Sequence, residues 1–289
     1  MKKGFLIGGG IIIIGLILEL SVGPVKWEAF AWPVNGIVLV GFLTVIIALF
    51  LLRKKIPAFR FIGTYQAAIP TMTYAVVLTI IMGLTKQTSD GTWLNSMLTF
   101  WPFVLIYVYM AVILGMVILR RHDIPFLLNH FGLFLAMTTA TLGNADMQRL
   151  MMITNVGETE WRALNQNGEV REMPLTVELK RFIMETYDDG SPKRFASEIQ
   201  ILTKSGKKIE TIVDVNKPVD VEGWKIYQYG YDTQMGAMSQ TSILELVRDP
   251  WLPAVYTGIY MMLAGAVCMF IFGNKKKIVN RKLSNCKSQ

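Results

Sequence analysis

PFLLNHFGLFLAMTTATLGNA, residues 125–145, is an apolar segment that carries a histidine, His130, in its interior. Its length suits a membrane-spanning helix that opens at Pro125. An ionisable side chain within the hydrocarbon region is costly, and it usually faces a bundle interior, a cavity or a cofactor. A neutral imidazole is a good ligand for haem iron and for transition metals. His130 is therefore the first candidate for a functional residue.

His130 also has a plainer explanation. Counted from Pro125 at roughly 1.5 Å per residue, it lies only about 7 Å into the predicted helix. At that depth its ring can reach lipid headgroups or bond to a neighbouring helix, with no ligand involved. For Thr138, Thr139 and Thr141, further along the same segment, packing against another helix is the simpler interpretation.

Five other apolar blocks accompany this one, and together they predict an integral membrane α-helical bundle of about six spans with an inserted extracytoplasmic, mostly-β domain. The chain is 52% hydrophobic and 17% charged, and its charges gather between the blocks. The predicted organisation is membrane helices one to five in residues 1–145, the β domain in residues 146–250, the last helix in residues 251–273 and a basic cytosolic tail in residues 274–289. The expected spans besides the His130 helix are 4–20, 34–52, 64–84, 97–119 and 251–272.

Lysine and arginine clusters indicate the orientation of these spans. They stand at Lys2 and Lys3, at residues 53–55, at Arg120 and Arg121, and at residues 275–277. Six spans with both termini in the cytosol place all of these clusters inside, as positively charged loops prefer. No small-residue cleavage site follows the first block, so we expect it to be an uncleaved anchor.

The polar region 146–250 reads as short antiparallel strands of a sandwich or barrel-like fold. Apolar and polar residues alternate around Leu175 and Ile209, and WKIYQYGY (224–231) is rich in strand-forming aromatics. Gly-containing turn signals separate these runs. The region holds 13 Lys or Arg and 17 Asp or Glu, a net charge of −4, which argues against nucleic-acid binding.

The predicted β domain offers little chemistry of its own. It has no histidine and no cysteine, and the whole chain has no CxxC and no CxxCH. Asp188 and Asp189 stand in DDGSP, where turn formation explains them. The aromatic side chains of the 224–231 segment are more readily one face of a core than a stacking surface for a flat ligand. We therefore expect no catalytic residue here.

Three tracts together resemble the ResB-like family of system II cytochrome c biogenesis. They are NHFG (129–132) followed by LGNADMQRL (142–150), then DVNKPVDVEGWKIYQYGYD (214–232), then LVRDPWLPAVYTGIYMMLAG (246–265). The middle tract is the most specific, because generic strand preferences rarely produce a VNKP, a Gly, a YQ and a YD at this spacing. The resemblance covers residues 125 to 273.

The resemblance implies a subunit of a bacterial inner-membrane complex that moves haem to the outer face and supports its attachment to apocytochrome c. It implies that His130 is an axial ligand to the iron of a transiently bound b-type haem. It also implies a tryptophan-rich membrane synthase subunit as a separate partner, since no such segment follows here. Any catalysis then belongs to the complex.

A second function class stays open. In it the chain is a non-catalytic membrane scaffold or receptor whose β domain binds a protein partner, and His130 only packs. A transporter is a weaker option, since Glu19 is the single acid inside the other spans. Bound haem discriminates between the first two classes.

Overall fold

The computed structural model describes residues 1–88, 91 and 93–286, those from 272 onward by their backbone alone. Contacts divide the chain into two compact units. The helical unit comprises residues Met1–Ala145 and Trp251–Gln289, and the β unit comprises Asp146–Pro250.

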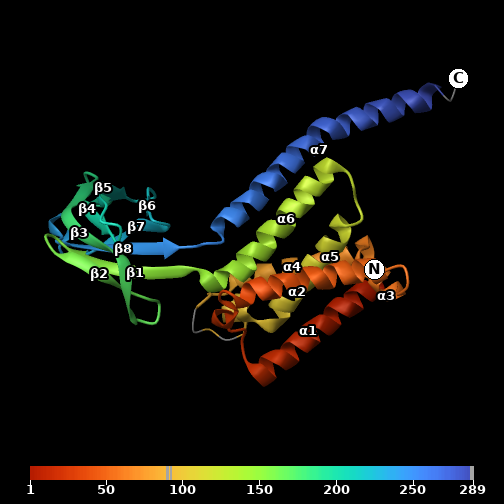
Figure 1. Cartoon of the computed structure of the whole chain (residues 1–289), viewed down its shortest axis with the longest axis horizontal. Coiled ribbons are helices and arrows are strands. Elements are labelled where there is room, and N and C mark those ends of the chain that lie inside the picture. The colour runs from red at the N-terminus through yellow and green to blue at the C-terminus, as the bar shows by residue number, and fades with distance from the viewer. Residues whose placement is uncertain (89–90, 92, 287–289) are drawn as a thin grey trace. The chain divides into compact units, whose positions relative to one another are not determined.

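The helical unit is built from apolar helices separated by short polar loops (Figure 1). Within the described residues, six helical segments are long and apolar enough to cross a membrane. The expectation of about six apolar helices that are long enough to span a membrane is therefore confirmed. A short helix after the second span, α3, was not expected from the sequence. The helices are α1 (Lys2–Val22), α2 (Val34–Leu52), α3 (Pro57–Ile62), α4 (Tyr65–Leu84), α5 (Trp101–Ile118), α6 (Ile124–Gly143) and α7 (Leu252–Cys286).

The end of α1 is tied to the start of α5 by polar contacts. Glu19 is 7% exposed, and its Oε2 accepts a hydrogen bond of 3.1 Å from the Trp101 backbone N–H, at the first residue of α5. The Trp101 indole donates to the Gly23 carbonyl at 2.8 Å. The carboxylate thus satisfies one of the N–H groups that a helix start leaves without a partner.

The centre of the helical unit is a small apolar core between α2, α5 and α6. Phe42 of α2 stacks on Phe134 of α6, with ring centroids 6.2 Å apart. Buried Ile46, Leu114 and Met137 fill the space around them. Near the C-terminal end of α6, the fully buried Asn35 of α2 donates from Nδ2 to the Leu142 carbonyl at 3.1 Å.

The β unit is one continuous antiparallel sheet in the order β5-β4-β3-β2-β1-β8-β7-β6. The expected antiparallel β fold is confirmed, but not all strands are short: β3 has 17 residues and β4 has 12. The strands are β1 (Gln148–Asn155), β2 (Thr159–Leu164), β3 (Val170–Thr186), β4 (Pro192–Thr203), β5 (Lys208–Asp214), β6 (Val219–Val221), β7 (Trp224–Tyr231) and β8 (Thr241–Arg248).

The sheet curls so that strands distant in its order meet across the interior. Ser197 of β4 donates to Ser242 of β8 through their hydroxyls at 2.6 Å, although three strands separate β4 from β8 in the sheet. Phe182 of β3 stacks on Tyr231 of β7 at 5.1 Å. The inward residues of both halves form one buried core, which includes Trp224. The fold is thus closer to the barrel-like alternative than to two separate sheets.

The turn signals of the sequence fall between strands. Gly168 separates β2 from β3 with φ 79°, and Gly190 separates β3 from β4 with φ 81°. Both angles lie in the left-handed region, which glycine adopts without strain. Gly190 thus lets the long β3 and β4 reverse tightly and pair along most of their length, and Gly168 allows the turn between β2 and β3.

Candidate functional site

His130 lies in the second turn of α6, about 9 Å along the axis from the first residue, Ile124. Pro125 occupies the opening turn, where its missing N–H is not needed. The imidazole Nδ1–H donates to the Phe126 carbonyl one turn earlier, at 3.0 Å. The His130 ring also stacks on the Phe126 ring, with centroids 3.7 Å apart and planes inclined by 21°. These two contacts fix both the tautomer and the orientation of the ring.

The other ring nitrogen of His130 is available for a ligand. With the proton on Nδ1, the Nε2 atom carries the lone pair, and no hydrogen bond to it is found among the described residues. A metal-bound histidine typically donates its remaining N–H to a carbonyl or carboxylate, as His130 does here. The half-buried imidazole, stacked on Phe126, is therefore chemically suited to hold haem iron.

Arginines lie close to the same end of α6. The guanidinium carbon of Arg121 lies 5.6 Å from the centroid of the Phe126 ring, the ring on which His130 stacks. Arg120 donates to the Gly63 carbonyl at 2.6 Å and to the Arg60 carbonyl at 2.9 Å. Partial burial, followed by the charges of Arg53 and Arg60, lowers the pKa of Arg120. Several like charges therefore crowd this end of the helical unit.

The opposite face of α6 packs against α7, and Figure 1 shows the two helices side by side. A Cβ on Gly132 would lie 2.5 Å from the Gly258 carbonyl oxygen, and one on Gly265 would lie 2.3 Å from the Asn129 nitrogen. The Asn129 side chain donates from Nδ2 to the Met262 carbonyl at 2.9 Å. Small residues and an interhelical hydrogen bond are the usual means of close helix packing in membranes. Asn129, the neighbour of His130, is thus held in place by α7.

The face of α6 that carries His130 continues into the apolar core. Phe134 and Met137 belong to that core, Tyr107 of α5 packs against it, and the Thr141 hydroxyl donates to the Met137 carbonyl at 2.9 Å. Thr138 likewise bonds to the carbonyl of Phe134 within its own helix, at 2.7 Å. The threonines therefore serve packing and local bonding, as the sequence indicated.

Asp189 has the turn role that the sequence indicated. Its Oδ1 accepts from the Ser191 hydroxyl at 2.6 Å and from the Ser191 backbone N–H at 2.9 Å, and these bonds lower its pKa. The expectation that the aromatic residues of segment 224–231 form one face of the core holds for the buried Trp224 but is wrong for Tyr229, which is 60% exposed because it lies on the other face of β7. Among the residues that the structure describes, no three His, Cys, Asp or Glu side chains gather as a metal site.

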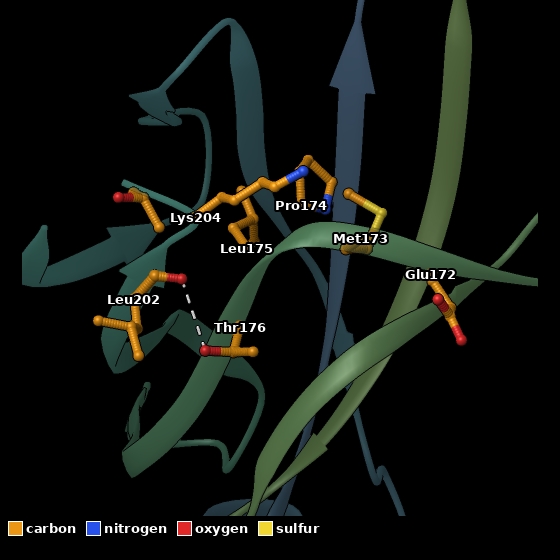
Figure 2. Close-up of a pocket in the computed structure, with 8 residues that line it drawn as sticks. Glu172, Met173, Pro174, Leu175, Thr176, Leu202 and Lys204 are labelled. Carbon is orange, nitrogen blue, oxygen red and sulfur yellow. Dashed lines mark hydrogen bonds between the residues drawn. The ribbon is translucent and has the colours of Figure 1, made fainter. Parts of the chain in front are cut away.

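One cavity of the β unit, of about 450 Å³, lies where β4 ends beside β3. Figure 2 shows the Lys204 side chain extending toward Pro174, and a hydrogen bond of 3.5 Å joins the Thr176 hydroxyl to the Leu202 carbonyl. Four of the eight lining residues are apolar, and the other four are Glu172, Thr176, Thr203 and Lys204.

A second cavity, of about 510 Å³, lies at the turn between β3 and β4 and at the end of β5. Its lining includes residues 214–217, the start of the most specific tract of the resemblance. Arg194 spans it, donating to Glu185 at 2.8 Å and to Asp214 at 2.9 Å. These ion pairs tie β3, β4 and β5 together at one end of the sheet.

Asn129, Phe126 and Arg121 were not singled out from the sequence. For Phe126 a signal existed, since residues four apart on a helix are neighbours. For Asn129 there was none, because its partner Met262 is 133 positions away.

Comparison with known proteins supports the resemblance for the first two tracts, residues 129–150 and 214–232, whereas the third, residues 246–265, lies outside the residues that the family model matches. Residues 119–243 match the ResB-like family. The cytochrome c biogenesis protein CcsB of Prochlorococcus marinus subsp. pastoris is 26% identical over 136 residues, which are 46% of this chain and 31% of that protein. The chain thus matches under a third of this relative's length.

Among solved structures, cytochrome c heme lyase CcmF superimposes with a TM-score of 0.33 and 15% identity, over 81% of this chain and 44% of that one. The family match itself runs from the end of α5 through α6 and the sheet into β8. The resemblance to the ResB-like family is therefore confirmed over residues 119–243, the stretch that contains His130.

Proposed function

We propose that this chain is a ResB-like subunit of a cytochrome c biogenesis complex, that it binds haem in the membrane through His130, and that it helps to deliver this haem to apocytochrome c on the outer face. The family match over residues 119–243 and the CcsB relative support the biogenesis role. The observation that carries the haem site is the oriented His130 ring, whose Nε2 is left for a ligand.

Each part of the site has a separate task. The Phe126 carbonyl holds the proton on Nδ1, so the Nε2 lone pair points outward. The stacked Phe126 ring limits rotation of the imidazole and shields one of its faces. If haem binds, the His130 imidazole would hold its iron through Nε2, and the apolar side chains around α6 would keep water from the site. A further protein ligand to the iron is expected from the partner.

The proposed location is the bacterial inner membrane, with both termini in the cytosol and the β unit outside the cell. Support comes from the even number of spans and from the basic clusters at residues 2–3, 53–55 and 120–121, which then share the cytosolic side. In this orientation His130 is near the cytosolic end of α6, where haem enters.

The proposed partners are a tryptophan-rich membrane synthase subunit in trans and apocytochrome c, which the β unit docks. The curled sheet has its own buried core. Residues 146–250 contain no histidine and no cysteine, and a docking role needs neither. The chain alone is then a haem-binding subunit, and attachment of haem is carried out by the complex.

The test is the visible absorption spectrum of the purified protein, coexpressed with its partner, for the parent and for His130→Gly. We expect a Soret band in the parent, its loss in the variant and its return when imidazole is added, because free imidazole fills the space left by the side chain and restores the ligand. His122→Gly, which removes the other histidine of the chain from an exposed loop position, is the matched control and retains the band.

Two outcomes contradict the proposal. The parent complex could lack haem, or His130→Gly could retain an unchanged spectrum. In either case the chain is better described as a membrane scaffold whose β unit binds a protein partner.

A further inference from the structure

Arg121 is a basic residue beside the stacked rings of Phe126 and His130. Its guanidinium carbon lies 5.6 Å from the Phe126 centroid, and Phe126 in turn lies 3.7 Å from the His130 ring. Arg121 lies in the loop between α5, which ends at Ile118, and α6, which begins at Ile124. Its side chain is exposed.

The neighbouring arginines have different tasks. Arg120 uses its guanidinium nitrogens on the Gly63 and Arg60 carbonyls, and so it fastens α3 to the end of α5. The Arg53 guanidinium lies over the Phe50 ring of its own helix and bonds to the Phe50 carbonyl. These contacts occupy Arg53 and Arg120, which leaves Arg121 as the arginine beside Phe126 and His130.

We propose that Arg121 binds a propionate carboxylate of the haem held by His130, and so sets which edge of the macrocycle faces the basic end of the helical unit. This inference rests on the proposed haem site. Guanidinium binds carboxylate with two parallel hydrogen bonds, and its charge persists at any physiological pH. An ionised carboxylate is costly in hydrocarbon, so the propionates of a membrane-bound haem favour the end where cations gather.

The stacked rings place Arg121 near His130. Phe126 is stacked on the face of the His130 ring, and Arg121 lies over Phe126. A haem held through Nε2 would carry its propionates at the edge of the macrocycle, and Arg121 would be the cation beside the imidazole to meet one of them.

The test is a haemin titration, followed by the Soret band, of the full chain in nanodiscs of zwitterionic lipid. Four proteins are compared: the parent, Arg121→Gln, His130→Gly and Lys55→Gln. The last removes one exposed positive charge from the basic cluster after α2 without touching Phe126. Each is titrated with haemin and with haemin dimethyl ester, in which both propionates lack their charge.

We expect Arg121→Gln to bind haemin about tenfold more weakly than the parent, since a hydrogen-bonded charge pair is lost. It should bind the dimethyl ester as tightly as the parent does, which also shows that the variant is folded. Lys55→Gln should match the parent with both ligands, and His130→Gly should lose both.

The outcomes separate this inference from the proposed function. If the parent binds no haemin, or if His130→Gly binds as the parent does, the haem site itself is wrong and the inference falls with it. If His130→Gly loses haemin but Arg121→Gln binds it like the parent, only the role of Arg121 is overturned. If Arg121→Gln loses the same affinity for haemin and for its dimethyl ester, that role is also overturned, because the substitution then disturbs the structure and not a contact with propionate.

A second arm tests the other source of an anion at this position, a lipid phosphate. The parent and Arg121→Gln are titrated again in nanodiscs that contain phosphatidylglycerol. If Arg121 binds propionate, the tenfold difference between them persists there with at most partial competition. A difference that is present only with phosphatidylglycerol makes the headgroup the ligand and overturns the assignment.

Discussion

Glu19 shows how one buried acid in a membrane segment can serve structure alone. It lies inside an apolar helix, a position that often marks function. Its carboxylate accepts the backbone N–H of Trp101, and so the start of α5 is held against the end of α1. The transporter interpretation of this residue therefore loses its main support.

Replacing Glu19 tests this contact. Glu19→Leu should destabilise the protein by about 1–3 kcal/mol, because it leaves the part-buried Trp101 N–H without this acceptor. Glu19→Gln keeps an acceptor oxygen and should cost less. The measurement is the unfolding temperature in detergent, which should be highest for the parent, lower for Glu19→Gln and lowest for Glu19→Leu. A Leu variant as stable as the parent would show that the hydrogen bond is unimportant.

At the scale of elements, the pairing of α6 with α7 depends on glycine residues at their contact. Gly132 and Gly258 bring the two backbones into contact, since a Cβ on either would lie within 2.6 Å of backbone atoms of the other helix. Backbone atoms cannot turn aside as a flexible side chain can. Any added methyl group must therefore push the helices apart.

Gly132→Ala should accordingly cost about 1–3 kcal/mol through overpacking. The matched control is Gly41→Ala in α2, where a Cβ meets nothing within 4 Å. It should be neutral or slightly stabilising, because alanine favours helix over glycine by about 1 kcal/mol. Unfolding temperatures in detergent compare the two variants. If both alanines have the same effect, the close packing of α6 and α7 is not what Gly132 provides.

The curled sheet depends on a buried polar cluster in its interior. The Ser242 hydroxyl accepts from Ser197 at 2.6 Å and from the Gln228 amide at 2.9 Å, and the two serines are fully buried. Ser242→Ala removes the shared partner and should cost about 1–3 kcal/mol. Ser191→Ala, in an exposed turn, should change stability by less than about 0.5 kcal/mol. Chemical denaturation followed by Trp fluorescence measures both, and equal effects would contradict the role of the cluster.

A helix or strand can be predicted from the sequence when apolar and polar residues are clearly separated, either along the chain or between the two faces of the element. α2 ends at Leu52, directly before Arg53, because charge stops an apolar helix at the membrane edge. β7 was foreseen from its aromatic residues. β8 was not, because Ile243 and Val247 on its outer face are as apolar as Leu244 and Leu246 on its inner one, which erases the two-residue period.

The candidate site follows from the sequence only in part. His130 stands out because it is a histidine in an apolar segment, and its role as a ligand stays a prediction. Arg121 could not be linked to it, because nothing in the spacing shows that the loop after α5 returns to the Phe126 ring. The close approach of Gly258 is likewise invisible, since its partner Gly132 lies in a helix far away in sequence.

At the scale of the whole molecule, the β unit has what a separate domain needs. It has one continuous sheet and a buried core of its own. Residues 146–250, expressed alone, should therefore fold into a monomeric β protein that unfolds cooperatively. Far-UV circular dichroism and a dispersed amide NMR spectrum test this. An unfolded or aggregated fragment would show that the helical unit is required for its folding.

The pairing of Gln148 with Arg248 places the entry and exit of the sheet on adjacent strands. A sequence that begins and ends at neighbouring points interrupts its host at a single place. The β unit is therefore an insertion between α6 and α7 that can be removed or exchanged at one junction, because the two chain ends to be rejoined lie on neighbouring strands.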